Sequence, residues 1–365
     1  MTTSPRSSLG SLADIIGYVA LVLIAVVAGS LYFDEPAPPK PPEPAPVAPR
    51  VDTPPESRLD RLTRLAQAGD VVSQRQLGQV YYYGMDVRRD YAEAVKWLKM
   101  AGGKGDMIAA QLLGFAHAYG HGAKIDQAEA VSWWRLASGQ GDELSSFELA
   151  KACLAGKGVE KSESEGLRYC RTSAEKGNAD AQLYLGYFYY VGRIVEQSYP
   201  DAFFWFRKSA VQANPLAQDY VGIMYRDGRS VPVNYDEAIR WFDYSITHRG
   251  GWGCYSMAGM YRDGKGFAKD EVKASAYFLK GAMLEHMDSQ VELARRYLAG
   301  KGLAVDPVEA CAWYDVAARK GDSDATVARD GMLRSLSSPQ VSAARTRSDA
   351  IISLIKDEKA ARRSP

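Results

Sequence analysis

A repeat period of 36 residues constrains the fold of this chain more than any other feature of its sequence. Counting from Gly78 in steps of 36 returns a small side chain at every step, without a gap over about 250 residues. These seven anchor positions are Gly78, Gly114, Ala150, Gly186, Gly222, Ala258 and Ala294. Self-similarity at such a period is typical of a repeat protein, whose units bury their apolar faces only against one another.

Other columns of residues share the period. A glycine follows each anchor by six residues, at Gly84, Gly120, Gly156, Gly192, Gly228, Gly264 and Gly300. An aromatic ring follows each anchor by nineteen residues, at Trp97, Trp133, Tyr169, Trp205, Trp241, Tyr277 and Trp313. We interpret the many Tyr and Trp residues of the chain as periodic core.

Each repeat is predicted to be a pair of helices. Apolar residues before the glycine column are spaced three and four apart, as a buried helical stripe requires, and glycine suits the left-handed residue that ends a helix. A second glycine two residues later, in four copies, is expected to loosen the loop. The aspartates twelve residues after the anchor can cap the next helix, and they are Asp90, Asp126, Asp270 and Asp306.

We therefore expect an all-α protein in which about seven helix–turn–helix repeats, at residues 71–322, stack into a right-handed superhelical α-solenoid. The two ends of the stack need caps. Residues 56–70 resemble a lone second helix, which would cap the N-terminal end. Residues 323–365 are predicted to hold the C-terminal cap helices and a tail, with a longer closing helix at 338–359.

The first 55 residues are predicted to be a tether. Residues 15–33 carry no charge, and a helix of this length spans about one hydrocarbon core. We expect a transmembrane helix at 12–33 after a short cytoplasmic tail at 1–11, with a cleaved signal peptide as the alternative. Ten prolines in residues 36–55 then indicate an extended proline-rich linker at 34–55.

The charges around this segment favour one topology. Arg6 and the terminal amine precede it, and Asp34 and Glu35 follow it. The excess of positive charge predicts a cytoplasmic N-terminus and a repeat domain on the exported side, in the bacterial periplasm. A cytoplasmic adaptor with reversed topology is the alternative.

Composition excludes several classes of protein. A net charge of +1 argues against broad neutralisation of nucleic-acid phosphates, and four Cys exclude a disulfide-dense scaffold. His117 and His121 have a spacing that can bind zinc, but no third ligand is evident, so we expect no metal. Cys153 and Cys170 lie on facing helices and could pair only with strain. We expect no cofactor and no enzyme activity.

The columns resemble the Sel-one-like repeat (SLR), a 36-residue relative of the tetratricopeptide repeat (TPR). In the first repeat the matching residues are Leu77, Gly78, Tyr81, Gly84, Asp90, Ala94, Trp97, Ala101 and Gly105. The resemblance covers about residues 70–338, and the third repeat departs furthest from it, with Ala150, Cys153 and Tyr169. It implies a scaffold for assembling protein complexes, often at membranes or in cell envelopes.

By analogy with TPR geometry, the concave face comes from fixed positions on the first helix of each repeat. We predict that a protein or peptide partner binds there, because aromatic residues and Arg are enriched at interfaces. The predicted residues are Arg75, Gln79, Tyr82, Tyr83, Gln111, Phe115, Tyr119, Phe147, Lys151, Tyr187, Tyr190, Arg226, Arg262 and Arg295.

The sequence thus predicts a membrane-anchored SLR scaffold that binds an envelope protein or peptide. A cell-wall-acting enzyme, or an accessory subunit of one, is the alternative. It would need ionisable side chains that converge outside the repeat columns, and the sequence offers no such group.

Overall fold

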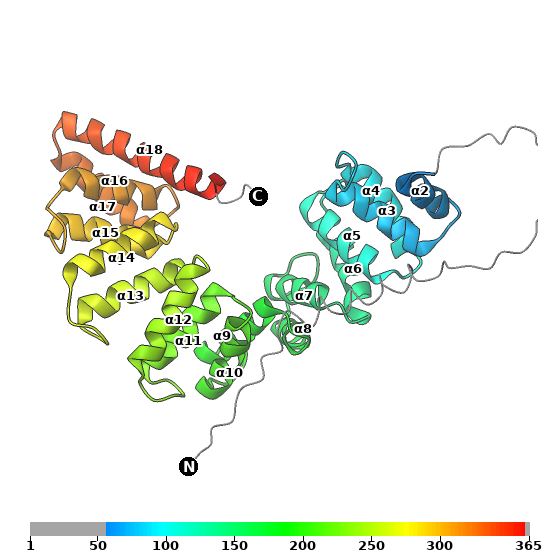
Figure 1. Cartoon of the computed structure of the whole chain (residues 1–365), viewed down its shortest axis with the longest axis horizontal. Helices are drawn as coiled ribbons and strands as arrows, with labels where there is room; N and C mark the ends of the chain where they lie inside the picture. Colours follow the sequence, from blue (N-terminus) through cyan, green and yellow to red (C-terminus); the bar gives the residue numbers. More distant parts are fainter. Residues whose placement is uncertain (1–55, 362–365) are drawn as a thin grey trace, which may run out of the picture. The chain divides into compact units, whose positions relative to one another are not determined.

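A computed structural model describes residues 56–361, which form 17 α-helices and contain no strand (Figure 1). The predicted membrane helix at 12–33, the tail before it and the proline-rich linker lie outside the described residues. Within the described part of the chain, no helix combines the length and apolarity that a membrane span requires.

Seven helical hairpins follow one another, as the period predicts. The pairs are α3 (Val71–Tyr83) with α4 (Tyr91–Gly102), α5 (Met107–Tyr119) with α6 (Gln127–Gly139), α7 (Glu143–Ala155) with α8 (Glu163–Glu175), α9 (Ala179–Val191) with α10 (Tyr199–Ala210), α11 (Pro215–Asp227) with α12 (Tyr235–Thr247), α13 (Gly251–Asp263) with α14 (Glu271–Met283), and α15 (Met287–Ala299) with α16 (Pro307–Ala318). Each helix packs against the next along the chain. The pattern of an α-helical solenoid is confirmed.

The helix ends form where the sequence places them. The glycine column ends every first helix in the left-handed conformation, with φ between 66° and 77°. Asp90, Asp126, Asp270 and Asp306 accept hydrogen bonds from backbone amides at the starts of α4, α6, α14 and α16. Both predictions are confirmed.

The second glycine of the loop has a different role from the one expected. Gly122, Gly158 and Gly302 have φ near +70°, and a Cβ on any of them would lie 2.0–2.1 Å from a backbone carbonyl oxygen. That oxygen belongs to the start of the second helix in the preceding repeat. These glycines therefore allow one repeat to touch the backbone of the previous one, and they make the loop tight rather than loose.

The side chain that fills the space beside the anchor stands twenty residues after it, one position after the column of aromatic rings. A Cβ on the four anchor glycines would lie 2.2–2.7 Å from the buried side chains of Leu98, Trp134, Phe206 and Phe242. The rings at nineteen are buried only at Trp97 and Trp313. Trp133 instead lies over Gly102 of the preceding repeat. Neighbouring residues of a helix point about 100° apart. The side chains twenty residues after the anchor therefore pack within one helical hairpin, whereas Trp133 at nineteen packs against the preceding repeat.

This contact predicts unequal effects of two alanine substitutions. In Gly222→Ala the new methyl group would lie 2.6 Å from the fully buried ring of Phe242, so we expect a loss of about 1–3 kcal/mol in unfolding free energy. Gly259→Ala, also within a first helix, meets nothing within 4 Å and should stabilise the chain by up to about 1 kcal/mol. Urea unfolding followed by circular dichroism measures both, and equal effects would contradict the packing described here.

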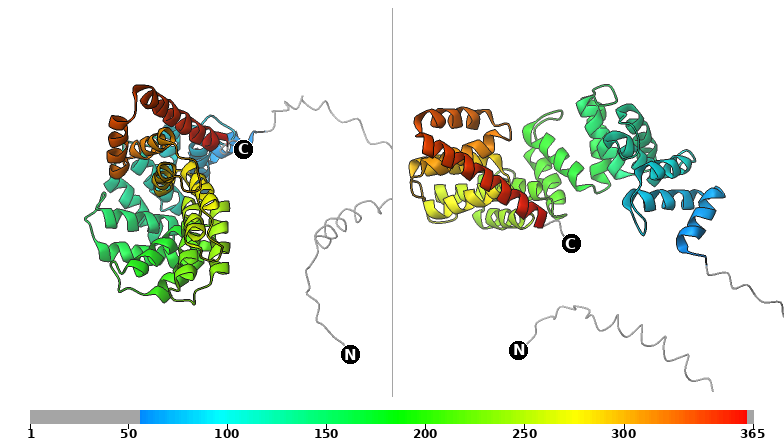
Figure 2. Two further views of the ribbon diagram at one scale, coloured as in Figure 1. Left: turned by 90° about the vertical axis from the view of Figure 1, so that its left-hand side faces the viewer. Right: turned by 90° about the horizontal axis from the view of Figure 1, so that it is seen from above.

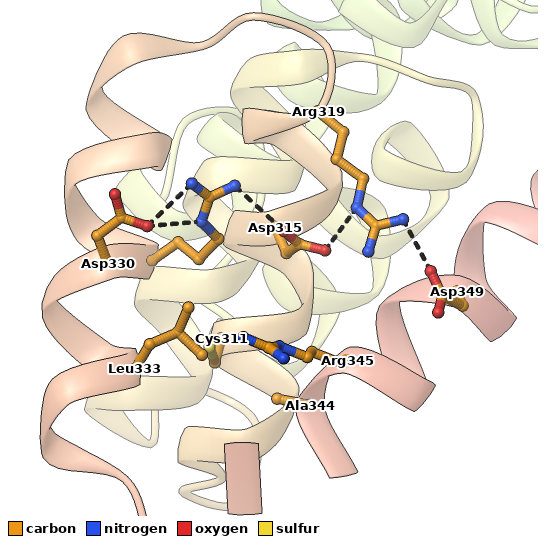
Figure 3. Close-up of a pocket in the computed structure, with 9 residues that line it drawn as sticks. Cys311, Asp315, Arg319, Asp330, Leu333, Ala344, Arg345 and Asp349 are labelled. Carbon is orange, nitrogen blue, oxygen red and sulfur yellow. Dashed lines mark hydrogen bonds and ion pairs between the residues drawn. The ribbon is translucent and has the colours of Figure 1, made fainter. Parts of the chain in front are cut away.

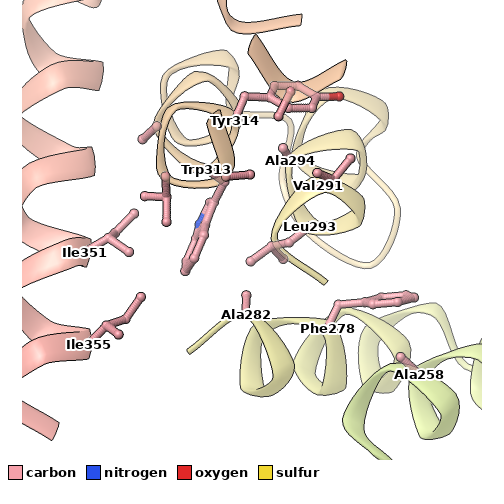
Figure 4. Packing of buried hydrophobic residues seen from close by; sticks show 14 of the residues in the cluster. Ala258, Phe278, Ala282, Val291, Leu293, Ala294, Trp313, Tyr314, Ile351 and Ile355 are labelled. Atoms are coloured by element: carbon pink, nitrogen blue, oxygen red, sulfur yellow. The ribbon is translucent and has the colours of Figure 1, made fainter. Parts of the chain in front are cut away.

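Separate helices close the two ends of the stack. At the start, α2 (Arg58–Gln67) packs on α3, with Ala66 buried against Leu77 and Trp97. At the end, α17 (Ser323–Ser335) and the long α18 (Ser338–Ala361) both pack on α16 (Figure 2). Figure 4 shows Ile351 and Ile355 of α18 directed toward Trp313 and Ala282. The predicted cap helices are present at both ends.

Candidate partner-binding surface

The first helices of neighbouring repeats touch each other, at α3/α5, α5/α7, α11/α13 and α13/α15. Within α3–α7 and within α11–α15, side chains one, four and five residues after the anchor therefore lie near those of the next repeat. At α9, the ring of Tyr187 lies 6.2 Å from that of Tyr220 on α11. We call the side chains at these three positions the first-helix face, which includes Gln79, Tyr82, Tyr83, Phe115, Tyr119, Lys151, Tyr187, Tyr190, Arg226, Arg262 and Arg295.

Four of these predicted residues are open to solvent. Tyr83, Tyr119 and Tyr187 are 50%, 55% and 40% exposed, and Arg295 is exposed beside Glu292, 3.6 Å away. Tyr119 stacks on the half-buried ring of Phe115, with ring centres 6.2 Å apart. Exposed tyrosines on rigid helices supply contact area at low cost in side-chain entropy, so these residues are available to a partner.

Two predicted residues belong mainly to the core. Phe147 is buried among residues of α8 and α9. Tyr82 is also buried, and its hydroxyl lies 3.0 Å from His121 Nδ1, while burial raises the pKa of Tyr82 to about 12. His121 in turn stacks on Tyr91. The Tyr82 and Phe147 side chains therefore hold the repeats together.

The position three residues before the anchor links adjacent repeats. Arg75 forms an ion pair with Asp106 at 3.3 Å, and Gln111 donates to Asp142 at 2.8 Å. Both aspartates cap the first helix of the following repeat. Arg75 and Gln111, which we predicted to bind a partner, thus already have partners within the chain.

An aromatic cluster joins α9, α10 and α11. Tyr190 packs edge-on against Phe206 and Tyr220, and Phe206 stacks on Tyr220 with ring centres 4.4 Å apart. The Arg229 guanidinium lies over the Tyr190 ring and donates to its hydroxyl. Tyr187 borders this cluster with its ring 6.2 Å from Tyr220. Substituting Tyr190 would therefore disturb packing as well as the surface.

Two pockets on this face bring predicted residues together. One, of about 300 Å³, is lined by Tyr119 and Lys151, with Trp134 and Glu148 beside them. Lys151 pairs with Glu148 at 2.8 Å. The other, of about 190 Å³, is lined by Arg226 and Arg262. The half-buried Gln79 lines neither pocket.

Sequence reasoning missed several residues that line the pocket of Arg226 and Arg262. They are Tyr255, Ser256, Gly259, Met260, Asp263, Lys265 and Phe278. Gly259 could have been found, because it occupies the column of Gln79, Phe115 and Lys151 and is the only glycine there. Ser256 gives no signal in the sequence, since serine is compatible with either burial or exposure.

A third cavity lies outside the first-helix face, between α16, α17 and α18. It measures about 410 Å³, and the Asp315 carboxylate bridges Arg319 at 2.7 Å and Arg329 at 3.2 Å within it (Figure 3). Asp330 and Asp349 bind the same two guanidiniums from the other side. Since each carboxylate here has an arginine partner, we interpret these pairs as fastening the C-terminal cap.

The histidines and cysteines do not gather into a metal site within residues 56–361. No three His, Cys, Asp or Glu side chains of this described part lie together as such a site would require. All four cysteines are buried free thiols. The Cys170 thiol faces the carbonyl oxygen of Ala181 in the next repeat at 3.4 Å, and it forms no disulfide with Cys153.

Comparison with known proteins identifies the repeats. The sequence matches the Sel1 repeat seven times, at residues 71–106, 108–142, 144–178, 179–213, 215–246, 253–286 and 288–322. The chain belongs to the Sel1 repeat family. Proteins of this family are typically non-enzymatic scaffolds for protein interactions. Membership of the family indicates this general role for the chain.

Solved structures of other Sel1 repeat proteins resemble this one. A Sel1 repeat protein from Oxalobacter formigenes is 29% identical, with a TM-score of 0.60 over 75% of this chain and 79% of that chain. A protective antigen of uropathogenic Escherichia coli with an SLR fold is 28% identical, with a TM-score of 0.53 over 84% of this chain and 74% of that chain. No curated protein matches the sequence.

Proposed function

We propose that this Sel1 repeat protein is a membrane-anchored scaffold that captures an envelope protein or peptide on its first-helix face. The observation that carries the proposal is the exposure of Tyr83, Tyr119 and Tyr187 on three first helices. Tyrosine is enriched at interfaces and among the residues that dominate binding energy. The face also offers two pockets into which partner side chains can project.

Site-specific photocrosslinking in the native host tests this surface. Benzoylphenylalanine placed at Tyr119 or at Tyr187 should give a crosslink to the same partner. The matched controls are Phe204 on α10 and Tyr244 on α12, which are 51% and 53% exposed but lie on second helices. Crosslinks of equal yield from the control positions, or from none of the four, would refute the proposal.

The double substitution Tyr119→Ala and Tyr187→Ala should lower the affinity for that partner about tenfold or more, because interface tyrosines often each contribute above 1 kcal/mol. Phe204→Ala with Tyr244→Ala should leave the affinity within about twofold. Since all four rings are substantially exposed, thermal unfolding should change little in either variant. Unchanged affinity in the first variant would rule out this face.

The anchoring part of the proposal rests on the uncharged run within residues 12–33 and the weak excess of positive charge before it. A periplasm-dependent reporter fused after Pro365 should be active in a bacterial host, and the chain should remain with the membrane after a carbonate wash. Activity only from a cytoplasmic reporter would establish the reversed topology instead. Release of the full chain by the wash would refute the anchor.

A further inference from the structure

We infer that the pocket between α11 and α13 receives an acidic side chain, Asp or Glu, of the protein or peptide partner. This rests on the proposed function and adds the chemistry of one contact. The pocket of about 190 Å³ has room for roughly six water molecules, which suits one side chain better than a cofactor.

Two arginines one repeat apart supply the donors. The Arg226 guanidinium binds Asp227 through Nε and Nη2, at 2.7 and 3.0 Å, and Arg262 binds Asp263 in the same way, at 2.7 and 3.1 Å. These forks fix both guanidiniums and leave the Nη1 group of each without an acceptor among the described residues. A carboxylate entering the pocket would therefore meet donors that are already oriented.

The charge around the pocket favours an anion. Arg226, Arg262 and Lys265 line it with one carboxylate, Asp263, and the second carboxylate, Asp227, is bound to Arg226. Arg229 adds a further positive charge 4.0 Å from Asp227. Glu292, whose charge also acts on Arg262, pairs with Arg295 at 3.6 Å. Three cations and one carboxylate thus line the pocket itself.

Ser256 adds a hydroxyl group to the lining of the pocket. Ser256 is 3% exposed, and its hydroxyl makes no hydrogen bond within the described chain. The Ser256 oxygen is not one of the fully buried polar atoms that lack a partner, so the hydroxyl can be reached from the pocket. A carboxylate oxygen that enters the pocket can accept a hydrogen bond from it.

Gly259 creates the space for such a group. A Cβ there would meet nothing within 4 Å, whereas the other six repeats carry a side chain in this column. Tyr255, Met260 and Phe278 supply apolar walls, and burial raises the pKa of Tyr255. Apolar walls strengthen an ion pair by lowering the local dielectric constant, and they can also pack against the methylene groups of a glutamate.

Selection from a random dodecapeptide phage library tests the inference, with the full chain immobilised in dodecyl maltoside. We expect selected peptides to contain Asp or Glu at a common position, about threefold or more above the unselected library. Changing that residue to Gln or Asn in a selected peptide should weaken binding about tenfold. Gly259→Leu, which fills the pocket, should abolish the acidic preference. Gly331→Leu is the matched control, because a Cβ at this helical glycine of α17 also meets nothing within 4 Å.

The outcomes separate this inference from the proposed function. An acidic preference that survives Gly259→Leu, or that Gly331→Leu also removes, would overturn the pocket. Peptides that lose binding in the Tyr119→Ala and Tyr187→Ala variant but show no acidic preference would overturn the pocket and leave the proposed function standing. Selection of no peptide by the wild-type chain would count against both.

Discussion

Arg296→Ala is expected to lower the free energy of unfolding by about 2–4 kcal/mol, because it removes a fully buried side chain together with its hydrogen bonds. Arg296 lies on α15 and is 1% exposed. Its guanidinium donates to the Ser275 hydroxyl at 2.7 Å and to the carboxylate and carbonyl oxygens of Glu271 at 2.6 and 2.9 Å. Ser275 donates in turn to the Lys301 carbonyl oxygen at 2.7 Å. Alanine would remove these bonds and leave a cavity between α14 and α15.

Arg296→Met separates the effect of charge from that of volume. The same column carries Met224 and Met260 in the two preceding repeats, and both are buried. Methionine should therefore fill most of the space, and its cost should be about 2 kcal/mol smaller than that of alanine. Urea unfolding followed by circular dichroism measures both variants, and hydrogen exchange localises the loss to α14–α16. A cost below about 1 kcal/mol for alanine would show that the arginine network does not stabilise the repeats.

Much of the fold could be predicted because the residues that end and begin helices recur at the same positions from repeat to repeat. The glycine column marks each helix end, since glycine adopts φ near +70° at no steric cost. The aspartate column marks the starts of four second helices, because a side-chain oxygen there accepts from free amides. The capping helices could be found by the same residue types at the two ends of the pattern.

The packing partner of each column could not be predicted from the period. Columns nineteen and twenty are both apolar in most repeats, so the sequence does not show that Phe242 meets the anchor while Trp133 meets the previous repeat. Which side chains are exposed on the surface was even harder to predict. Phe147 stands three residues before its anchor and Tyr119 five residues after its anchor. Both were predicted to face a partner, yet the first ring is buried and the second is exposed. Exposure depends on the side chains of the adjacent repeat, which the column itself does not specify.

Single residues that depart from their columns have properties that the repeat pattern does not predict. Asp219 stands where other repeats have Arg75, Gln111 or Leu183, and no column predicts that an acid is buried there. It is 1% exposed, and neither carboxylate oxygen makes a hydrogen bond of normal geometry, although the Ser245 hydroxyl and the Gly253 amide lie beside it. Burial raises the pKa of Asp219 to about 8, since desolvation penalises the charged form.

The sign of the resulting pH dependence follows from linkage. An unfolded aspartate has its ordinary pKa near 4, so between about pH 4 and 8 the folded chain holds a proton on Asp219 that the unfolded chain has released. The contribution of this group to stability is therefore full below pH 4, and it falls as the pH rises toward 8. The slope reaches up to about 1.4 kcal/mol per pH unit.

Asp219→Asn removes this titration. The variant should therefore unfold with a higher free energy than the wild type, and this difference should be smallest near pH 4 and grow to several kcal/mol by pH 8. The asparagine amide can donate toward the Ser245 hydroxyl oxygen, which has no partner in the wild type. Asp236→Asn is the matched control, because this exposed acid lies in the first turn of α12 and should change stability by less than about 1 kcal/mol. Urea unfolding at pH 5, 6, 7 and 8 measures the difference between each variant and the wild type. A constant difference for Asp219→Asn across that range would show that Asp219 is ionised in the folded chain. The growing difference that we expect would identify this buried acid as the group that makes the repeats less stable as the pH rises.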